Sequence, residues 1–242
     1  MAPPKKFETS LFKKEQVSKD AYSFYFKKPD DFAYIAGQYL RMTIPISNPD
    51  ERGSSRFFTI SSSPTENHLM ITTRIIQSSF KKTLVSLTPE IPISILAPFG
   101  SFTLQQSENG PYIFLAGGIG VTPLRSMIRY AVDTNLILPI TLITSFRTSE
   151  DIVFAEELRE IAIRHSWLAL IETVTRPEES AKSWTGKTGR IDASLIKENI
   201  KDPFSSLFYI SGAPAMVDSL AQLVQSIGVN NKKIKVEKFS GY

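Results

Sequence analysis

The sequence predicts two domains, a six-stranded antiparallel β-barrel followed by a parallel α/β domain. Up to about Leu104, short extended runs alternate with turn residues, and this pattern is typical of a small barrel. From Tyr112 onward, apolar strands alternate with helices, as in a parallel sheet that is covered on both faces. The polar segment 105–111 between them ends in Gly-Pro and indicates a boundary. We therefore expect domains at residues 1–106 and 111–242.

Each strand predicted for the barrel is a short run of apolar, aromatic and β-branched residues bounded by glycine or proline. The six runs are Phe7 to Lys14, Ala21 to Lys27, Tyr39 to Ile44, Arg56 to Ile60, His68 to Ile76 and Pro92 to Ala97. One helix is expected at residues 79–87, with Ser78 or Ser79 as its N-cap. Leu84 and Leu87 would form its inner face.

The α/β domain is predicted from five apolar runs with helical segments between them. The strands are expected at residues 112–116, 140–145, 168–174, 207–211 and 234–238, and the helices at 123–133, 150–165, 192–199 and 214–227. Thr148 and Asp151 are spaced like a capping box for the second of these helices. Ligands of such sheets bind at the carboxyl ends of the strands.

The amino-acid composition limits the kinds of metal site and redox group that the protein can contain. The 242 residues include no cysteine, which excludes disulfides, thiolate metal sites and cysteine-bound iron–sulfur clusters. His68 and His165 lie too far apart in the sequence to form a recognisable catalytic or metal-binding constellation. Any redox chemistry must then come from an organic cofactor. We expect no bound metal.

Charge and hydropathy indicate a cytoplasmic protein. No apolar run reaches the roughly eighteen residues of a membrane span, and no apolar signal segment follows Met1. The net charge of +4 comes from scattered lysine pairs, which we interpret mainly as solvated surface. The alternative is a basic face that steers an acidic partner protein. Nucleic acid is a less favoured partner, because no nucleic-acid module signature is present.

A glycine-rich segment predicts a phosphate site in the second domain. The run Gly-Gly-Ile-Gly-Val-Thr-Pro at residues 117–123 follows a buried strand and opens a helix, as in a Rossmann-like domain. Glycine lets the backbone approach a ligand closely, and the first amides of the helix point at it. We expect Thr122 to cap the helix and Pro123 to stand in its first turn.

A second phosphate site is predicted in the barrel. Arg56 lies in extended chain, two residues before Phe58 and three before Thr59. A guanidinium grips phosphate oxygens with paired donors. Strand alternation would place Arg56 and Phe58 on one face. Phe57 and Phe99 are interpreted as ordinary core aromatics.

Taken together, these motifs resemble the ferredoxin–NADP reductase superfamily. The similar features are the Arg-x-aromatic-Thr segment, the glycine run, and the Ser-Gly-x-Pro-x-Met segment at 211–216, in this order. Two further matches are the Ala-Pro-Phe-Gly-Ser-Phe turn at 97–102 and Glu-Lys-Phe at 237–239. Each motif alone is common, but their joint order covers almost the whole chain. The resemblance implies an FAD-binding barrel, with FAD favoured over FMN, and a NAD(P)-binding domain.

The resemblance implies roles for several barrel residues. Arg56 would bind the flavin pyrophosphate, and Thr59 would lie near the flavin atom that accepts hydride. Phe58 stands where the family usually has a stacking tyrosine, so the ring contact remains and the hydroxyl is missing. The other flavin-binding residues implied are Ser78, Ser79 and Lys81 at the helix start and Thr73, Arg74 and Ile75 on the neighbouring strand.

Roles in the second domain follow in the same way. The residues expected to hold the nicotinamide cofactor are Gly118, Gly120, Thr122, Pro123, Gly212 and Pro214. Ser211 replaces the cysteine of many relatives, and we expect hydride transfer to persist but to be slower. Glu237 is a candidate proton relay or nicotinamide contact, and Tyr242 a candidate for stacking on the flavin. Arg147, just past the second strand of this domain, would pair with a 2′-phosphate and slightly favours NADPH over NADH.

The activity implied is hydride transfer from NADPH or NADH to FAD, followed by electron transfer to a separate acceptor. That acceptor would be an acidic electron-acceptor protein, such as a ferredoxin, a flavodoxin or an oxygenase component, or a small oxidant. Two alternatives remain at this point. The chain could be an electron-transfer subunit of a larger oxidoreductase, or a flavin-binding module without turnover, as Phe58 and Ser211 would suggest.

Overall fold

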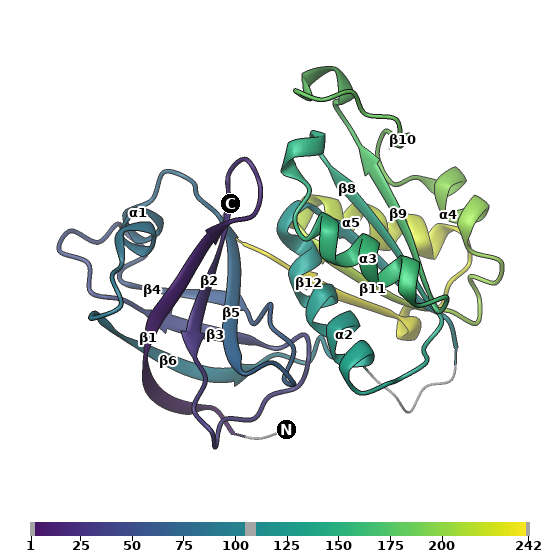
Figure 1. The fold of residues 1–242 in the computed structure, drawn as a ribbon. Coiled ribbons are helices and arrows are strands. Elements are labelled where there is room, and N and C mark those ends of the chain that lie inside the picture. Colours follow the sequence, from purple (N-terminus) through teal and green to yellow (C-terminus); the bar gives the residue numbers. More distant parts are fainter. Residues whose placement is uncertain (1–2, 105–109, 241–242) are drawn as a thin grey trace.

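The computed structural model describes residues 3–104 and 110–240 and has two sheets of six strands each (Figure 1). The first sheet is formed before the predicted boundary and the second after it. Most of that boundary, residues 105–109, lies outside the described residues. The division at 106 and 111 therefore stays a prediction.

The first sheet is a nearly closed antiparallel barrel, as predicted. Its order is β4-β3-β6-β1-β2-β5. The strands are β1 (Lys5–Gln16), β2 (Ala21–Lys27), β3 (Tyr39–Thr43), β4 (Ser55–Thr59), β5 (His68–Arg74) and β6 (Pro92–Phe99). The two edge strands approach each other where the Ser61 amide donates to the Met70 carbonyl at 2.7 Å. Because this bond joins the ends of the sheet, the barrel encloses its own apolar core, which includes Phe24, Phe26, Leu40 and Ile95.

One helix, α1 (Ser79–Ser86), accompanies the barrel. The Ser78 hydroxyl accepts a hydrogen bond from the Lys81 amide at 3.1 Å, so Ser78 is the N-cap. Leu84 and Leu87 are buried in the barrel core, and this confirms the predicted inner face. The cap fixes where the helix begins, and therefore where its first amides point.

The second sheet is parallel, with the order β10-β9-β8-β7-β11-β12. Its strands are β7 (Tyr112–Gly117), β8 (Ile140–Phe146), β9 (Leu168–Val174), β10 (Lys187–Thr188), β11 (Leu207–Gly212) and β12 (Ile234–Lys238). The helices are α2 (Val121–Asp133), α3 (Ala155–Arg164), α4 (Ala193–Asn199) and α5 (Pro214–Ser226). Along β7, Phe114 packs in the cluster shared with α2 and α3, whereas Leu115 packs with α4 and α5. Both faces are covered, as the apolar strands predicted.

The second predicted helix of this domain is shorter than expected. Residues 150–165 do not form one helix: a 3₁₀ turn, η2 (Ser149–Asp151), is followed by α3. Phe154 has a left-handed backbone with φ 61°, which interrupts the helical path. Asp151 Oδ2 accepts hydrogen bonds from the Thr148 amide and hydroxyl, both at 3.0 Å. The predicted capping box therefore exists, but it caps the start of η2 and not the start of a long helix.

Strand β10 was not predicted. It has two residues and lies at the edge of the sheet beside β9. Such a short polar strand has no apolar pattern in the sequence, because little of it is buried.

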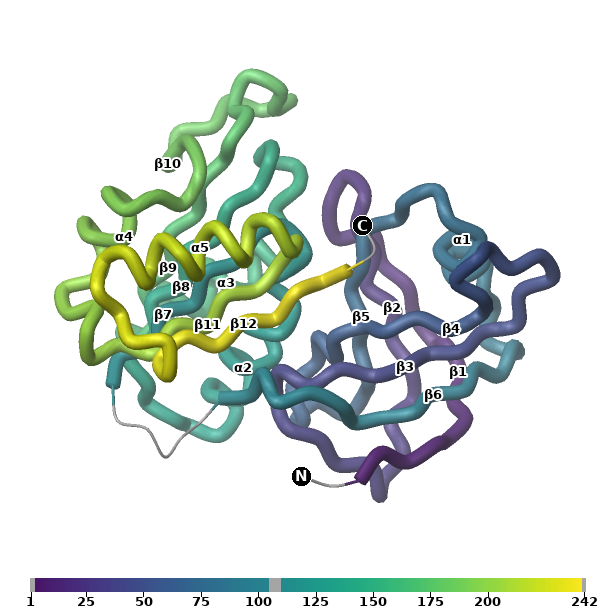
Figure 2. Tube along the Cα trace, turned by 180° about the vertical axis from the view of Figure 1, so that it is seen from behind, coloured from purple at the N-terminus to yellow at the C-terminus, as the bar shows by residue number. Residues whose placement is uncertain are grey.

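The two domains are joined by more than the connecting segment. After β12 the chain crosses from the parallel sheet to the barrel (Figures 1 and 2). The Phe239 amide donates to the Gly212 carbonyl at 2.9 Å along this path.

Among the described residues, no helix combines the length and the apolar character that crossing a membrane requires.

Candidate functional site

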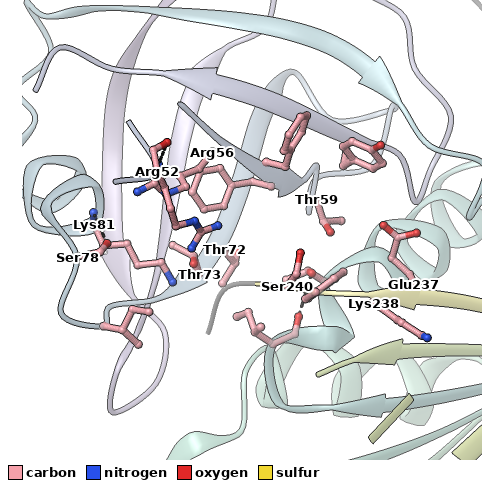
Figure 3. Close-up of a pocket in the computed structure, with 17 residues that line it drawn as sticks. Arg52, Arg56, Thr59, Thr72, Thr73, Ser78, Lys81, Glu237, Lys238 and Ser240 are labelled. Atoms are coloured by element: carbon pink, nitrogen blue, oxygen red, sulfur yellow. Dashed lines mark hydrogen bonds between the residues drawn. The ribbon is translucent and has the colours of Figure 1, made fainter. Parts of the chain in front are cut away.

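Two pockets lie at the junction of the domains, and they share Ile76 and Ile119. The first, which we call the barrel pocket, is bounded mainly by the barrel and by the segment after β12 (Figure 3). Its polar lining residues are Tyr39, Arg52, Arg56, Thr59, Thr72, Thr73, Ser78, Lys81, Thr122, Glu237, Lys238 and Ser240. Figure 3 shows Arg52, Arg56 and Lys81 toward one end and Thr59 and Glu237 toward the other.

Arg56 is buried and organises the loop before β4. Its Nη1 donates to the carbonyls of Arg52, Gly53 and Ser55, each at 2.8 Å, and its Nη2 donates to Asp50. The guanidinium also lies 5.2 Å from the centre of the Phe80 ring. Arg56 could therefore bind a phosphate only with the N–H donors that do not already bond to the loop. Its role in phosphate binding stays a prediction.

Lys81 is a buried cation in a cationic environment. Its Nζ donates to the Arg74 carbonyl at 2.6 Å. Burial, and then the positive charges of Arg52 and Arg74, lower the pKa of Lys81 to about 8. A buried ammonium is stabilised by an opposite charge, so this end of the barrel pocket has the chemistry of an anion site.

The aromatic residues of β4 have unequal environments. Phe58 packs on the barrel core with its ring 5.7 Å from that of Phe80, so Arg56 and Phe58 do face the same side. Phe57 is 62% exposed, and its interpretation as a core aromatic was wrong. Phe57 instead meets the Tyr39 ring edge-on, 5.7 Å away. The alternation of β4 turns Phe57 away from the core.

Thr59 and Glu237 line the same pocket although they come from β4 and β12. Burial raises the pKa of Glu237 to about 7. A carboxyl with such a pKa exchanges a proton near neutral pH. The predicted roles of Thr59 and Glu237 depend on this location and stay predictions.

Of the four other predicted flavin contacts, two line a pocket and two line neither pocket. Thr73 lines the barrel pocket, whereas Arg74 lines the second pocket and pairs with Asp20 at 3.1 Å. The Ile75 amide donates to the Asp20 carbonyl at 2.7 Å, and Ile75 lines neither pocket. The hydroxyl of Ser79 accepts from the Asp50 amide at 2.9 Å. Ser79 therefore supports the loop near Arg56.

The second pocket, which we call the glycine pocket, lies at the carboxyl ends of the parallel strands. It has a volume of about 630 Å³, and its lining residues include Gly117, Gly118, Ser145, Arg147, Thr175, Arg190, Ala213 and Met216. Gly118 has φ +52° and open space beside it. A Cβ at Gly120 would overlap the Ser211 carbonyl, because β11 lies against the turn. Gly118 therefore leaves room for a ligand beside the backbone, whereas Gly120 allows β11 to pack closely against the turn.

Thr122 does not cap the helix that follows. Helix α2 begins at Val121, and Thr122 stands inside it with its hydroxyl donating to the Ile119 carbonyl at 3.0 Å. The prediction of an N-cap was wrong, because the short 3₁₀ turn η1 (Gly118–Gly120) leads directly into α2. Pro123 does stand in the first turn. Thr122 lines the barrel pocket.

The segment after β11 is packed tightly. Ser211 is fully buried, and its hydroxyl donates to the Gly120 carbonyl at 2.6 Å. It lines neither pocket, so its hydroxyl fastens the glycine turn to β11. Gly212 is buried beside Gly117, with φ +147°. Pro214 is exposed and opens α5, while its neighbour Ala213 lines the glycine pocket.

Arg147 lines the glycine pocket from the end of β8. Its Nη2 pairs with Glu179 at 2.7 Å, and Arg176 pairs with the same carboxylate at 2.8 Å. Arg147 is exposed, so a phosphate could compete with Glu179 for its guanidinium. Tyr242 lies outside the described residues.

Some lining residues were missed by the sequence argument. Arg52 adds a cation to the barrel pocket, and it could have been found as a second basic residue four positions before Arg56. Arg190 and Asp20 line the glycine pocket but carry no motif, since they come from separate loops that only the fold brings together.

The residues present fit FAD in the barrel pocket and a nicotinamide dinucleotide in the glycine pocket. The buried cation Lys81, the nearby Arg52 and Arg56, and the capped start of α1 match a pyrophosphate. The open space beside Gly118 admits a second phosphate group close to the backbone.

Comparisons with known proteins agree with this geometry. The oxidoreductase NAD-binding domain family matches residues 114–222. Ferredoxin–NADP reductase B of Sorangium cellulosum is 27% identical over 244 residues, covering 96% of this chain and 97% of that protein. The glycine betaine monooxygenase reductase subunit of Chromohalobacter salexigens is 26% identical over 221 residues, covering 90% of this chain. This chain spans only 59% of that subunit.

The fold is shared with solved structures. A ferredoxin NADP⁺ reductase from Neisseria gonorrhoeae with bound FAD and NADP matches with a TM-score of 0.78 at 19% identity, over 96% of this chain and 98% of that chain. An antiparallel barrel followed by a parallel α/β sheet, the cation-lined and glycine-lined pockets between them, and these relatives lead to one conclusion. Over almost its whole length the chain is similar to the ferredoxin–NADP reductase-like superfamily of FAD-dependent NAD(P)H oxidoreductases.

Proposed function

We propose that this protein takes hydride from NADPH or NADH onto a bound FAD and passes the electrons to a separate acceptor. The observation that carries the proposal is the contact between the two pockets, which share Ile76 and Ile119. A ligand in each pocket would meet the other at these residues. FAD and the nicotinamide supply the hydride chemistry when bound, and the chain supplies binding and orientation.

The barrel pocket divides into a binding end and a reacting end in this proposal. Arg56, Lys81 and the amides at the start of α1 would hold the flavin pyrophosphate, with Ser78 fixing the helix start. Phe58 would pack against the flavin, and Thr59 would lie at the reacting end. Main-chain groups near Thr73 would orient the flavin between them.

Glu237 would hold a proton at the reacting end. Its carboxyl is partly buried in the barrel pocket, and burial raises its pKa to about 7. At neutral pH such a group is present in both protonation states, so it can give and take a proton. Ser211 would act indirectly, by holding the Gly120 carbonyl and with it the glycine turn.

We propose NADPH as the preferred donor. Arg147 stands at the end of β8 in the glycine pocket, where the adenosine ribose would lie in such a domain. Arg190 lines the same pocket and adds a second cation, and the acidic residue of this lining among the described residues, Asp20, is paired with Arg74. A 2′-phosphate would thus meet positive charge.

The acceptor is proposed by class. The relatives are named as a ferredoxin–NADP reductase and as the reductase subunit of a monooxygenase. These names suggest a ferredoxin or an oxygenase component, and the chain's net charge of +4 would favour an acidic protein. The relative named as a reductase subunit also supports a second candidate, a reductase that works within a larger oxygenase system. A cytoplasmic location stays a prediction.

One spectroscopic experiment tests the core of the proposal. The purified protein, supplied with FAD if needed, is titrated without oxygen with NADPH and separately with NADH. We expect the flavin absorbance near about 450 nm to bleach, faster with NADPH, since hydride transfer belongs to the cofactors. A protein that binds neither FAD nor FMN would refute the function. Binding without bleaching by either nucleotide would support the flavin-binding module instead.

A further inference from the structure

Arg125 on α2 is a buried residue to which the proposed cofactor sites assign no role. All five of its N–H donors have acceptors. Its Nε and Nη2 donate to Glu157 at 2.9 and 2.6 Å, and Nη2 also donates to Glu66 at 3.1 Å. Its Nη1 donates to Glu66 and to the Ser61 carbonyl, the latter at 3.1 Å. The Phe154 ring lies 5.6 Å from the guanidinium.

These acceptors belong to different domains. Glu157 is on α3 of the α/β domain, whereas Ser61 and Glu66 lie between β4 and β5 of the barrel. The next residue of α2 strengthens the connection, because the Ser126 hydroxyl donates to the Ser62 carbonyl at 2.6 Å. The side chains of Arg125 and Ser126 on α2 therefore bind the carbonyls of two neighbouring barrel residues, Ser61 and Ser62. We call this set of contacts the α2 clamp.

The α2 clamp lies close in sequence to both pockets. Ser61 follows Thr59 by two residues, and Thr59 lines the barrel pocket. Arg125 follows Thr122 by three residues, which is about one helical turn after the residue that lines the same pocket. The glycine turn precedes α2 directly. A displacement of α2 against residues 61–66 would thus change the distance between the two pockets.

The charges of the clamp are mutually dependent. Burial acts to raise the pKa of Glu66, but hydrogen bonds from Arg125 outweigh it and hold that pKa below its usual value. Burial likewise acts against the charge of Arg125, but Glu66 and Glu157 raise its pKa. Removing the guanidinium would leave two carboxylates facing each other in a partly buried place. Such an arrangement holds one geometry only while all members are present.

We propose that Arg125 is a positioning residue which fixes the barrel and the α/β domain at the separation that hydride transfer requires. The inference rests on the proposed function. Reacting atoms must approach to about 3–3.5 Å, and a misplacement of about 1 Å can cost on the order of 100-fold in rate. A clamp that touches neither cofactor pocket would therefore affect the rate of transfer without affecting flavin affinity.

The test compares variants of the full chain. Arg125→Lys keeps the charge but cannot reach all the acceptors, and Arg125→Met with Glu66→Gln removes the cation together with one carboxylate, which limits the risk of unfolding. Arg164→Met is the matched control, because Arg164 lies on α3 and pairs with Glu160 of the same helix at 2.5 Å. Folding is verified by circular dichroism.

Two measurements are made. Anaerobic stopped-flow follows flavin bleaching at saturating NADPH, and hydrogen–deuterium exchange follows residues 61–66 in protein without nucleotide. We expect the reduction rate to fall about 10- to 100-fold in the double variant, and less in the lysine variant. Flavin affinity should stay within about twofold, and exchange at 61–66 should accelerate because the clamp amides open more often. The control should match the parent.

The outcomes separate this inference from the proposed function. A parent protein that binds flavin but is not reduced by either nucleotide refutes the function. A parent that is reduced, with clamp variants reduced at the same rate, refutes only the role of Arg125. Equal losses of flavin affinity and rate would also overturn it, since they would indicate general damage to the barrel.

Discussion

The two pockets at the domain junction are built from different kinds of group. The barrel pocket gathers charged side chains, with Arg56 and Lys81 buried and Arg52 at its edge. The glycine pocket instead offers backbone without side chains at Gly117 and Gly118, and Arg147 and Arg190 of its lining are exposed. Both would receive the pyrophosphate of a dinucleotide.

The difference corresponds to two modes of binding. Charge-assisted contacts in a buried place are roughly twice as strong as neutral ones and favour a ligand that remains bound. Main-chain amides beside an open space orient a phosphate at lower cost and permit exchange. A resident FAD and an exchangeable nicotinamide are the pair of ligands that this contrast fits. Each of the variants below changes a residue in or beside one of the two pockets.

Replacing Arg56 should have the largest effect. In Arg56→Ala, three carbonyls and Asp50 lose their donor, so the loop before β4 loosens and the pocket loses a cation. Each charged hydrogen bond contributes about 1.5–3 kcal/mol. We expect FAD affinity, measured by calorimetry, to fall about 100-fold or more. Arg41→Ala, on the exposed side of β3, is the control. Equal affinity of both variants would contradict a cationic flavin site.

Gly120→Ala should disturb the other pocket. Its Cβ would overlap the Ser211 carbonyl, and backbone cannot yield as a side chain can. Overpacking of this kind costs about 1–3 kcal/mol. We expect a melting temperature lower by several degrees and a KM for NADPH raised about tenfold, measured by calorimetry and initial rates.

Gly118→Ala is the matched comparison. Its Cβ meets open space, but φ +52° strains an alanine by about 1–2 kcal/mol. We expect a smaller loss of stability than at Gly120, while flavin affinity stays that of the parent in both. Identical melting temperatures for the two variants would argue against the tight contact with β11.

Lys81 makes flavin affinity depend on pH. Its pKa in the protein is about 8, and a bound phosphate would raise it, so binding takes up a proton above pH 8. We expect parent affinity for FAD to be constant below pH 8 and to weaken as pH rises through 8. Lys81→Met should bind about tenfold more weakly at pH 7 and lack this dependence. Lys82→Met, exposed on the same helix, should titrate like the parent.

Glu237 should make the free energy of unfolding depend on pH between about 4.5 and 7, which is below the range in which Lys81 acts. Its folded pKa of about 7 exceeds the usual value of 4.5, so the folded state binds more protons than the unfolded chain between these values. Stability contributed by the neutral carboxyl is present below pH 4.5 and is lost as pH rises through 7. Glu237→Gln should therefore melt like the parent at pH 4.5 and higher than the parent at pH 8. A parallel shift at both pH values would exclude this carboxyl as the cause.

Arg147 should have the smallest effect, because it is exposed and already paired. In Arg147→Ala we expect KM for NADPH to rise about two- to fivefold with little change for NADH, as a surface ion pair contributes about 1 kcal/mol or less. Steady-state rates with each nucleotide measure this. Arg176→Ala is the control, since Arg176 shares Glu179 but does not line the pocket. Equal changes for both nucleotides would remove Arg147 from the 2′-phosphate site.

Local patterns were sufficient for much of this molecule. The apolar run at 112–116, the hydroxyl of Ser78 as a cap and the capping pair Thr148–Asp151 all depend on neighbours in sequence, so they could be predicted. The predicted cap at Thr122 failed because the η1 turn leads into α2 without a break. The continuous helix at 150–165 failed because Phe154 adopts a left-handed backbone with no glycine to signal it.

The sequence by itself determined the two-domain order, the alternation of strands and helices, and the positions of Arg56 and the glycine turn, because these follow from periodicity and residue type. Only the tertiary structure decided that Glu237 and Thr59 line the same pocket, that the Ser211 hydroxyl donates to the Gly120 carbonyl, and that Arg125 joins the two domains. Those partners are separated by tens of residues. Their contact depends on how the barrel and the parallel sheet pack against each other, which periodicity along one segment does not contain.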